Sequence, residues 1–449
     1  MIYDVIVIGA GPAGKNSSIA LAKEGKKVCL IEKFENHIGG TCLNEGCIPA
    51  KLYLESVSYL GKKAYLESCG LKVEKASFDM SVLNSKKETL LDQLRNSAET
   101  NIKKSGIDMI FGEAVFESEN SILVNGESIK ADKFIIAAGS THRPHPLLSV
   151  DKKQIISSDE VFELEKIPSS IIVVGGGAIG CEFATFFNSL GTKVHIVEFT
   201  PNLVPAEDGD VSSTLKRELE RKGIKVSLDT NVTSFEKKEN RVILGLQTSK
   251  GEASDEAELV LVSIGRIPNT QNLKLENAKV DSERGFVTVD ENLRTTNPNV
   301  YALGDVIPTP ALAHVAYDEA KVVANNILGK TQIQPSPVIP FVTFCQPQVA
   351  SVGLHEKELK AKNIEYEVIK SFFKSSAKAK IKGYDGGFIK LFCEKESGVI
   401  LGGAMIGNDT TELIHEILIA VNKKLTKKDL RDMVFAHPTL SESLWAMLQ

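Results

Sequence analysis

The chain has 449 residues, of which 53 are Lys or Arg and 58 are Asp or Glu, so its net charge is -5. This balance argues against a nucleic-acid or anionic-membrane partner, because such partners select basic surfaces. No apolar run approaches the roughly 18 residues needed to cross a bilayer, so we expect a soluble globular chain of about three domains.

The first segment predicts a dinucleotide-binding unit. Ile2–Ile8 is an apolar strand, and the glycine loop Gly9–Gly14 opens a helix that ends near Gly25. A second strand, Val28–Ile31, is followed by Glu32. The glycines let a pyrophosphate approach the helix N-terminus, and the acid accepts hydrogen bonds from a ribose. The alternative is a tight turn with a surface glutamate. A strand that leads at once into a glycine loop is not a signal peptide, so we expect a cytoplasmic protein.

A close cysteine pair follows in GGTCLNEGCIPAK, residues 39–51. Regular helix between Cys42 and Cys47 would extend about 7.5 Å, and a disulfide needs Cα atoms within about 7 Å, so the segment must bend. Gly46 permits that bend. Pro49 suits a first helical turn, which places Cys47 at a helix N-terminus, where a thiolate is favoured. The alternative is two unrelated thiols in a loop.

Between this segment and the next glycine loop, two elements are predicted. Asp92–Lys104 belongs to a polar helical excursion, and Phe134–Ser140 is a strand that ends in a tight glycine turn.

The dinucleotide-binding pattern then recurs in the same register. Ile171–Val174, the loop Gly175–Gly180, Gly191, Val194–Val197 and Glu198 repeat the first copy, so we predict two dinucleotide sites in one chain. The second acid repels a 2′-phosphate, and the residues after it supply no arginine, which favours NAD over NADP. A purely structural role for this acid is the alternative.

Two further strands precede a linker. Leu259–Gly265 is apolar, and Val300–Asp305 gives a strand, a glycine and an acid. Asp305 either binds a cofactor sugar chain or caps the helix that includes Asp318–Ile327. The three prolines of Thr331–Pro340 indicate a linker.

The C-terminal part changes to an α+β pattern without a glycine-rich loop, which suits subunit contacts. Its predicted elements are the strands Val342–Val352, Gly387–Glu394 and Gly398–Met405 and the helix Leu413–Asn422. Near the end, His437 is able to exchange protons with a thiol while Glu442 holds the imidazole. Alternatively, Thr439 and Glu442 form a capping box.

A dithiol and two dinucleotide sites predict an electron relay between an external thiol, the cysteine pair, a flavin in the first site and a diffusible nicotinamide. The motifs GGTCLNEGCIPAK, GGGAIGCEF, SIGRIPNT, YALGDV, LAHVAYDEA and HPTLSE carry a resemblance across the whole chain. The chain resembles the flavin-dependent pyridine nucleotide–disulfide oxidoreductases, and most closely their dihydrolipoamide dehydrogenase branch.

The resemblance implies an α/β protein with two Rossmann-like FAD/NAD(P)-binding domains and a C-terminal α+β dimerisation domain. The implied boundaries are 1–146 for the first part of the FAD-binding domain, 147–270 for the NAD-binding domain, 271–335 for the central second part and 336–449 for the interface domain. A homodimer is expected.

The resemblance also assigns roles. Cys42 exchanges disulfides with a lipoyl group, and Cys47 is the flavin-side thiolate. Lys51 lies near the flavin and pairs with Glu182, whereas His437 and Glu442 act as base and orienting partner from the other subunit. The implied FAD-binding residues are Gly9, Gly11, Gly14, Glu32, Lys33, Gly40, Thr41, Lys51, Ala138, Gly139, Asp305 and Ala313, and the implied NAD-binding residues are Gly175, Gly177, Gly180, Glu198 and Gly265.

The implied activity is NAD-dependent oxidation of dihydrolipoamide and of the lipoylated carrier domains of 2-oxo-acid dehydrogenase or glycine-cleavage complexes. No metal, nucleic-acid or membrane partner is expected. Rival interpretations are another NAD(P)H-dependent disulfide reductase and a non-catalytic flavoprotein subunit. A glutathione-type reductase should show arginines after the second nucleotide strand, and a mercuric reductase should show a C-terminal cysteine pair; the sequence has neither.

Overall fold

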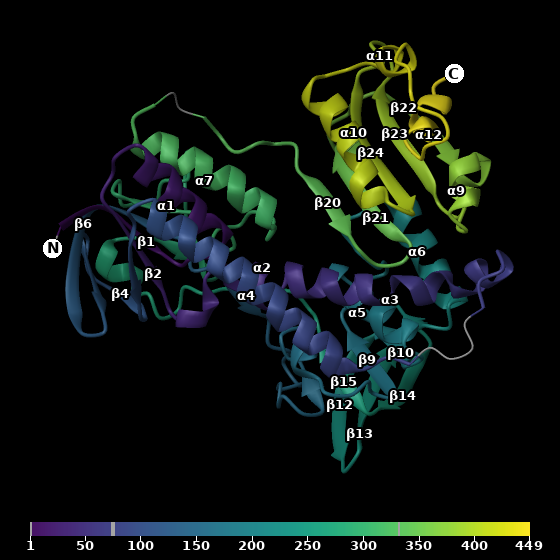
Figure 1. Cartoon of the computed structure of the whole chain (residues 1–449), viewed down its shortest axis with the longest axis horizontal. Coiled ribbons are helices and arrows are strands. Elements are labelled where there is room, and N and C mark those ends of the chain that lie inside the picture. Colours follow the sequence, from purple (N-terminus) through teal and green to yellow (C-terminus); the bar gives the residue numbers. More distant parts are fainter. Residues whose placement is uncertain (1, 73–76, 331–332) are drawn as a thin grey trace. The chain divides into compact units, whose positions relative to one another are not determined.

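The computed structural model describes residues 2–72, 77–330 and 333–449. Its internal contacts divide the chain into two compact units. Unit 1 comprises Met1–Ala50, Val82–Arg143 and Gly265–Pro337, and unit 2 comprises Lys51–Ser81, Pro144–Ile264 and Val338–Gln449. Two long helices, α3 (Cys47–Ser68) and α4 (Met80–Lys104), contain residues of both units (Figure 1). The second of them contains the predicted helical excursion.

Unit 1 begins with the predicted strand, glycine loop, helix and strand. Strand β1 (Ile2–Ile8) pairs in parallel with β2 (Val28–Glu32), and α1 (Pro12–Lys23) connects them. Glu32 is the last residue of its strand and is only 6% exposed, so the alternative of a surface glutamate is wrong.

The main sheet of unit 1 has the order β3-β2-β1-β6-β5-β4, and β19 also pairs with β6. Strand β6 (Glu127–Ile136) begins earlier and ends earlier than the predicted Phe134–Ser140. Gly139 has φ +69°, a left-handed conformation that extended strand does not use, so the chain turns before β7 (Ser140–His142). Strand β19 (Val300–Ala302) lies within the predicted segment.

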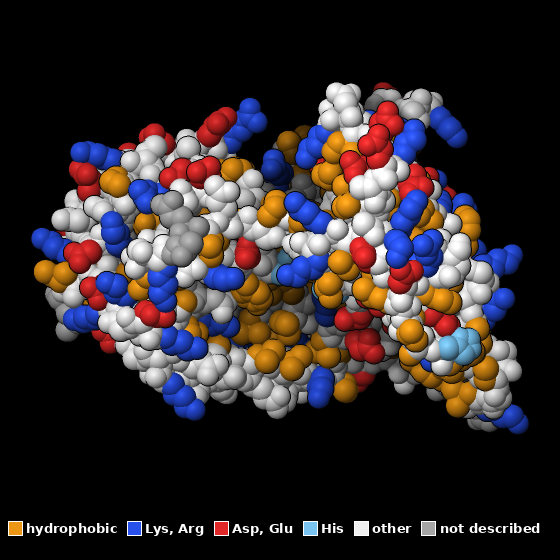
Figure 2. Space-filling view, turned by 90° about the horizontal axis from the view of Figure 1, so that it is seen from above, with side chains coloured by type: hydrophobic (Ala, Val, Ile, Leu, Met, Phe, Trp, Pro, Cys, Tyr) orange, Lys and Arg blue, Asp and Glu red, His pale blue; other side chains and the backbone are white. Residues whose placement is uncertain are grey.

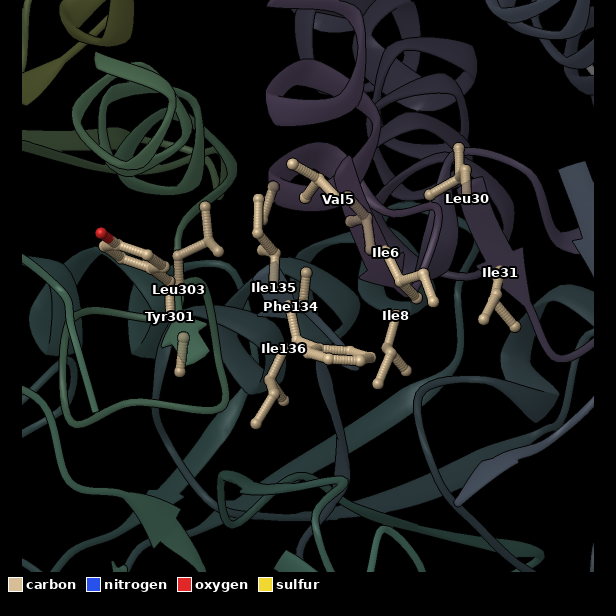
Figure 3. Close-up of a cluster of buried hydrophobic side chains, with 14 of the residues drawn as sticks. Val5, Ile6, Ile8, Leu30, Ile31, Phe134, Ile135, Ile136, Tyr301 and Leu303 are labelled. Carbon is tan, nitrogen blue, oxygen red and sulfur yellow. The ribbon is translucent and has the colours of Figure 1, made fainter. Parts of the chain in front are cut away.

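The core of unit 1 is built from apolar residues of these parallel strands (Figure 3). Val5, Leu30, Phe134 and Ile135 are fully buried, and Tyr301 of β19 is 2% exposed. A parallel sheet is covered on both faces, so its strands form nearly continuous apolar runs. This explains why the two strands around the first glycine loop were predicted from residue pattern alone.

Unit 2 contains the second copy of the βαβ pattern. Strand β9 (Ser170–Val174), α5 (Ala178–Ser189) and β10 (Lys193–Val197) match the predicted segments. The parallel sheet has the order β11-β10-β9-β15-β8. Strand β15 (Leu259–Val262) is shorter than the predicted Leu259–Gly265.

The C-terminal residues of unit 2 form an antiparallel sheet with the order β20-β21-β24-β23-β22. The prediction of one strand over Val342–Val352 is wrong, because β20 (Pro340–Thr343) and β21 (Gln348–Gly353) are separate antiparallel strands. Pro347 lies in the turn between them, where its missing N–H removes no ladder hydrogen bond. Strand β22 (Tyr366–Phe372) was not predicted.

The other C-terminal predictions hold within a few residues. Strands β23 (Phe388–Glu394) and β24 (Ile400–Gly407) pair with each other, and α10 (Thr410–Asn422) packs on β24. Within the predicted linker, residues 333–339 have no regular structure, Pro340 is the first residue of β20, and residues 331–332 lie outside the described residues.

The remaining strands and helices complete these units. They are α2 (Gly40–Asn44), β3 (Asp108–Phe111), β4 (Ala114–Ser118), β5 (Ser121–Val124), β8 (Ile155–Ile156), α6 (Gly209–Arg221), β11 (Lys225–Ser227), β12 (Asn231–Lys238), β13 (Arg241–Thr248), β14 (Gly251–Ala257), β16 (Arg266–Pro268), β17 (Ser282–Glu283), β18 (Phe286–Val287), α7 (Ala313–Ile327), α8 (Glu356–Ala361), α9 (Ala377–Ile381), α11 (Lys427–Arg431) and α12 (Glu442–Ala446).

Acidic and basic side chains share the surface. On the face drawn in Figure 2, Lys and Arg side chains are interspersed with Asp and Glu side chains. Among the helices of the described residues, none combines the length and the apolar character that a bilayer crossing requires.

Candidate functional site

The cysteine segment forms the short helix α2 and the start of the long helix α3, and Gly46 lies between them. Cys42 lies in α2, and Cys47 is the first residue of α3, as the sequence predicted. Cys47 is exposed, and Pro49 stands in the first turn of its helix. The unsatisfied N–H groups of that turn carry positive partial charge, which favours the thiolate form of a cysteine.

Gly46 brings the two parts of this segment together. A Cβ atom at this position would lie 2.8 Å from the carbonyl oxygen of Thr41 and 3.3 Å from the Cα atom of Cys42. The backbone immediately before Cys47 therefore packs directly on the backbone of Cys42, and a residue with a side chain would push the two cysteines apart.

The cysteine segment also packs on the first glycine loop. The N–H of Gly39 donates a hydrogen bond to the carbonyl oxygen of Ala10 at 2.9 Å. Gly40 has φ +62°, and a Cβ atom there would lie 2.7 Å from the Cα atom of Gly11. The predicted dithiol and the predicted FAD site are therefore adjacent within unit 1.

Two residues that the sequence analysis missed lie in the electrostatic neighbourhood of the sulfurs. Burial raises the pKa of Tyr317 above its ordinary value, and Cys42 and Cys47 act in the same direction. Burial lowers the pKa of Lys15, while Cys42 acts in the opposite direction. Lys15 belongs to no motif quoted above, and Tyr317 lies in LAHVAYDEA, which carried the resemblance but gave no indication of a position near the cysteines.

The three glycines of the first loop have different surroundings. Gly9 has φ +105°, and a Cβ atom at Gly14 would lie 1.9 Å from the carbonyl oxygen of Gly9. A Cβ atom at Gly11 would meet only the Cα atom of Gly40, at 3.8 Å. These are the demands of a dinucleotide loop: a tight turn, close packing of helix on strand, and open space for a pyrophosphate.

The second loop repeats this arrangement. Gly175 has φ +110°, a Cβ atom at Gly180 would lie 1.9 Å from the carbonyl oxygen of Gly175, and a Cβ atom at Gly177 would meet nothing within 4 Å. Neither α1 nor α5 has a side-chain N-cap or an acidic residue in its first turn. Both helix N-termini therefore suit a phosphate group.

The acid at the end of each second strand holds its own glycine loop. Glu32 accepts hydrogen bonds from the N–H groups of Ala10 at 2.9 Å and Lys33 at 2.7 Å. Glu198 accepts from the N–H of Gly176 and, at 2.7 Å, from that of Thr200. The structural role considered for Glu198 is thus present, and a carboxylate retains further acceptor positions for a ribose.

Asp305 belongs to a hydrogen-bonded chain that the sequence analysis missed. The hydroxyl of Ser140 donates to Asp305 Oδ2, and the guanidinium of Arg266 donates to that hydroxyl at 2.7 Å and to the Ser140 carbonyl at 2.6 Å. The alternative that Asp305 caps the following helix is wrong, because α7 begins at Ala313 with Leu312 as its N-cap residue.

Lys51 and Glu182 form an ion pair, as the resemblance implied. The ammonium of Lys51 lies 2.9 Å from Oε2 and 3.1 Å from Oε1 of Glu182, whose side chain is 7% exposed. Glu182 Oε1 also accepts from the N–H of Phe344 at 2.9 Å, and the ammonium lies 4.7 Å from the centroid of that ring. The pair is therefore fixed from three elements of unit 2.

The C-terminal motif pairs Glu442 with both His437 and Thr439, but Thr439 is not a helix cap, because α12 begins at Glu442 with Ser441 as its N-cap residue. His437 Nδ1 lies 2.8 Å from Glu442 Oε2. Glu442 Oε1 accepts from the Thr439 N–H at 3.3 Å, and the Glu442 N–H donates to the Thr439 hydroxyl at 3.2 Å. A single carboxylate therefore both orients the imidazole and forms reciprocal hydrogen bonds with Thr439 in the turn that precedes α12, so the capping-box alternative is wrong as a helix cap.

The other predicted site residues have simpler surroundings. The ammonium of Lys33 lies 3.1 Å from Glu113, and the carbonyl of Ala138 accepts from the Asn269 amide at 3.1 Å. Gly265 has φ +109° and lies in unit 1, whereas Gly175, Gly177, Gly180 and Glu198 lie in unit 2. The cysteine pair and Asp305 belong to unit 1, and Lys51, Glu182, His437 and Glu442 belong to unit 2.

Two family models together match most of the chain. Residues 3–320 match the family model described as pyridine nucleotide-disulphide oxidoreductase, and residues 339–448 match the dimerisation domain of that family.

Curated relatives align over nearly the full length. The dihydrolipoyl dehydrogenase of Bacillus subtilis is 35% identical over 98% of this chain and 96% of its own length. The dihydrolipoyl dehydrogenase of Chlorobaculum parvum is 39% identical over 98% of this chain and 95% of its own length.

Solved structures agree with these matches. RclA of Escherichia coli, an HOCl-induced flavoprotein disulfide reductase, superposes with a TM-score of 0.89 at 28% identity and covers 99% of both chains. LpdA of Mycobacterium tuberculosis superposes with a TM-score of 0.90 at 25% identity and covers 99% of this chain and 98% of that one. The chain therefore belongs to the pyridine nucleotide-disulphide oxidoreductase family.

Proposed function

We propose that the protein is a dihydrolipoyl dehydrogenase, an FAD-containing enzyme that oxidises dihydrolipoyl groups with NAD. The observation that carries the proposal is the packing of Gly46 on the backbone of Cys42, which places Cys47 beside it at the start of α3. The near full-length similarity to dihydrolipoyl dehydrogenases supports the same choice of substrate.

The two glycine loops fit the two cofactors. FAD would be held by Gly9, Gly11, Gly14 and Glu32 of the first loop together with Asp305, and NAD by the second loop with Glu198. When bound, these cofactors accept the electron pair of the reduced dithiol and pass it from flavin to nicotinamide. The open space over Gly11 and Gly177 and the uncapped helix N-termini support this assignment.

The chemistry of the chain's own residues is thiol–disulfide exchange. In the oxidised enzyme Cys42 and Cys47 are joined by a disulfide. A base takes a proton from one substrate thiol, and the resulting thiolate attacks the Cys42 sulfur, so that the S–S bond breaks and Cys47 leaves as a thiolate. After passing the first proton to solvent, the base takes the proton of the second substrate thiol, and the resulting thiolate attacks the substrate sulfur bonded to Cys42, which closes the lipoyl disulfide and releases the Cys42 thiolate. The pair has gained two electrons and the substrate has lost two.

The remaining residues support these steps. The helix N-terminus at Cys47 stabilises its thiolate. In the proposed homodimer, His437 of the partner subunit is the base, and its carboxylate neighbour fixes the imidazole orientation. Lys51, fixed by Glu182, supplies a positive charge one helical turn after Cys47 on the same helix.

The proposal also covers the macromolecular substrates, the cellular location and the domain boundaries of the protein. Its macromolecular substrates would be lipoylated carrier domains of a 2-oxo-acid dehydrogenase or glycine-cleavage complex, and it would act in the cytoplasm. The proposed domains are 1–146 and 271–335 for FAD, 147–270 for NAD and 336–449 for dimerisation; the match of residues 339–448 to a dimerisation domain supports the last of them.

The test is NADH formation from dihydrolipoamide and NAD by the purified flavoprotein, with NADP as the alternative acceptor. We expect turnover with NAD, a much slower reaction with NADP, and loss of at least about 10³-fold in Cys42→Ser and Cys47→Ser because each removes one half of the exchange chemistry. The exposed cysteine that follows α3 gives the matched control, Cys69→Ser, which should keep full activity. A yellow wild-type protein that is inert with dihydrolipoamide and NAD would contradict the proposal and favour a non-catalytic flavoprotein.

A second candidate is another disulfide reductase of the same family. The superposition on RclA, a flavoprotein disulfide reductase, is the reason to test this second activity in the same assay. NADH- or NADPH-dependent reduction of glutathione disulfide or coenzyme A disulfide, faster than reduction of lipoamide, would support this candidate over the first.

A further inference from the structure

The side chain of Lys15 projects from the helix on which the cysteine segment packs. Lys15 follows the third glycine of the first loop, and its N–H donates to the carbonyl oxygen of Gly11 at 3.0 Å, so it belongs to the first turn of α1. The same Gly11 is the residue that Gly40 of α2 approaches. Cys42 follows within the first turn of α2. The two first turns are therefore in contact.

The charge of Lys15 has no carboxylate counterpart among the described residues. The side chain is half-buried, and within residues 2–72, 77–330 and 333–449 it forms no ion pair with a carboxylate. Burial lowers the pKa of Lys15, and the Cys42 sulfur acts in the opposite direction. A half-buried ammonium is screened less than an exposed one, so its effect on a neighbouring thiolate is correspondingly larger.

A second helix completes the surroundings of the sulfurs. Tyr317 of α7 acts electrostatically with both Cys42 and Cys47. Tyr317 also lines a small cavity together with Asn16, the residue that follows Lys15 on α1. Helix α7 packs on α1, and Lys15 is the cationic residue in the first turn of α1.

We propose that Lys15 is a positioning residue for the thiol exchange assigned to Cys42: its ammonium stabilises the Cys42 thiolate. In the proposed reaction this thiolate is the leaving group when the lipoyl disulfide closes, and a better stabilised thiolate leaves faster. The helix N-terminus stabilises Cys47 and Lys15 stabilises Cys42, so each sulfur has its own source of positive charge. This inference rests on the proposed function, because it assigns Cys42 the role that exchanges with substrate.

The test measures the reactivity of each cysteine in the reduced holoenzyme. Protein reduced with dithiothreitol and freed of it is alkylated with iodoacetamide between about pH 5.5 and pH 9, a range that brackets perturbed thiol pKa values, and mass spectrometry quantifies the modification of Cys42 and Cys47 separately. The variants are Lys15→Met and Lys15→Gln, which remove the charge, and Lys15→Arg, which keeps it. Lys23→Met, in the last turn of the same helix, is the matched control.

We expect Lys15→Met and Lys15→Gln to slow alkylation of Cys42 at about pH 7 by about threefold to tenfold and to move its midpoint to higher pH, since a nearby charge in a partly solvated site is worth roughly 1 kcal/mol. Lys15→Arg should restore the wild-type profile, Lys23→Met should match it, and Cys47 should change less than Cys42. Flavin content and melting temperature identify any variant that fails to fold.

An unchanged Cys42 profile in both neutral variants overturns the inference, as does a Lys15→Arg protein that behaves like Lys15→Met. Dihydrolipoamide turnover by the wild-type enzyme distinguishes a failure of the proposed substrate from a failure of the proposed role of Lys15. A protein that turns over dihydrolipoamide but shows no dependence on Lys15 contradicts the inference alone. A protein with the Lys15 dependence but no such turnover contradicts the proposed substrate and leaves the electrostatic role of Lys15 in place.

Discussion

Nδ1 of His437 lies 2.8 Å from Oε2 of Glu442, while Oε1 of the same carboxylate accepts the Thr439 N–H at 3.3 Å. One carboxylate therefore fixes both the imidazole and the local backbone. The contact occupies Nδ1 and leaves Nε2 for proton transfer. The side chain of His437 is 74% exposed, as a base that serves another subunit would need to be.

We expect His437→Gln to lower dihydrolipoamide turnover by about 10²-fold to 10⁴-fold, the usual contribution of a general base. Its melting temperature should hardly change, because the side chain is exposed. Thr439→Ala is the matched control: it removes the hydroxyl that accepts the Glu442 N–H and should cost about 1 kcal/mol of stability while keeping most of the activity. Steady-state kinetics and thermal unfolding of both variants check this. Full activity in His437→Gln would exclude the base role.

The two glycine positions of the second loop should separate binding from folding. Gly177→Ala adds a Cβ atom to open space at an allowed backbone conformation, so the protein should keep its melting temperature while its KM for NAD rises. Gly180→Ala adds a Cβ atom 1.9 Å from the Gly175 carbonyl, so it should lower the melting temperature. Thermal unfolding and NAD titration of the two variants give the comparison. Equal effects on folding would contradict the assigned roles.

Removing the cation from the Lys51–Glu182 pair should lower the free energy of unfolding, because the buried Glu182 carboxylate is then left without a counter-charge. We expect Lys51→Met to lose about 1 to 3 kcal/mol of unfolding free energy, less than for a fully buried pair because the Lys51 side chain is 35% exposed. The double variant Lys51→Met, Glu182→Gln should recover part of that loss, since no uncompensated carboxylate remains. A denaturant-based double-mutant cycle measures the coupling. Additive losses would show that the pair does not stabilise the fold.

Glu207 should make stability depend on pH. Burial raises the pKa of its carboxyl from 4.5 to about 7, although a hydrogen bond with Ser351 acts in the opposite direction. Between these two pH values the unfolded state has already released the proton that the folded state keeps, so stability falls as pH rises from about 4.5 to about 7. Above about pH 7, the unfolding free energy of the wild type stays lower by the full amount that this titration costs.

Glu207→Gln removes this titration, so we expect the variant to gain about 1 to 3 kcal/mol over the wild type at about pH 8.5 and much less at about pH 5. Denaturant unfolding at the two pH values measures the difference. Glu276→Gln, at an exposed position, is the control and should show no such pH-dependent gain. If the Glu207→Gln variant gains the same stability at both pH values, the carboxyl is not buried in its neutral form.

Local pattern was sufficient to predict the two βαβ units and the start of α3. The strands around both glycine loops are buried on both faces, and the glycine spacing places turn, phosphate approach and packing at fixed positions. The helix start at Cys47 followed from Gly46 and Pro49 in the same way.

The omissions arose where distant segments meet, and the wrong strand prediction arose from a missed local turn. Val342–Val352 was predicted as one strand, although the polar residues around Pro347 mark the turn between β20 and β21. Ser140, Arg266 and Asp305 are joined only by the fold. Lys15 resembles any other surface lysine of a helix until the contact between Gly11 and Gly40 places its turn against the cysteines.

The measurement that tests the central claim most directly is differential alkylation of the oxidised enzyme before and after addition of dihydrolipoamide without NAD. The account predicts that Cys42 and Cys47 are both protected before substrate and both alkylated after it, while Cys69 is labelled equally in the two samples. Labelling of Cys42 and Cys47 that is the same with and without dihydrolipoamide would contradict the assignment of this pair as the substrate-reduced disulfide.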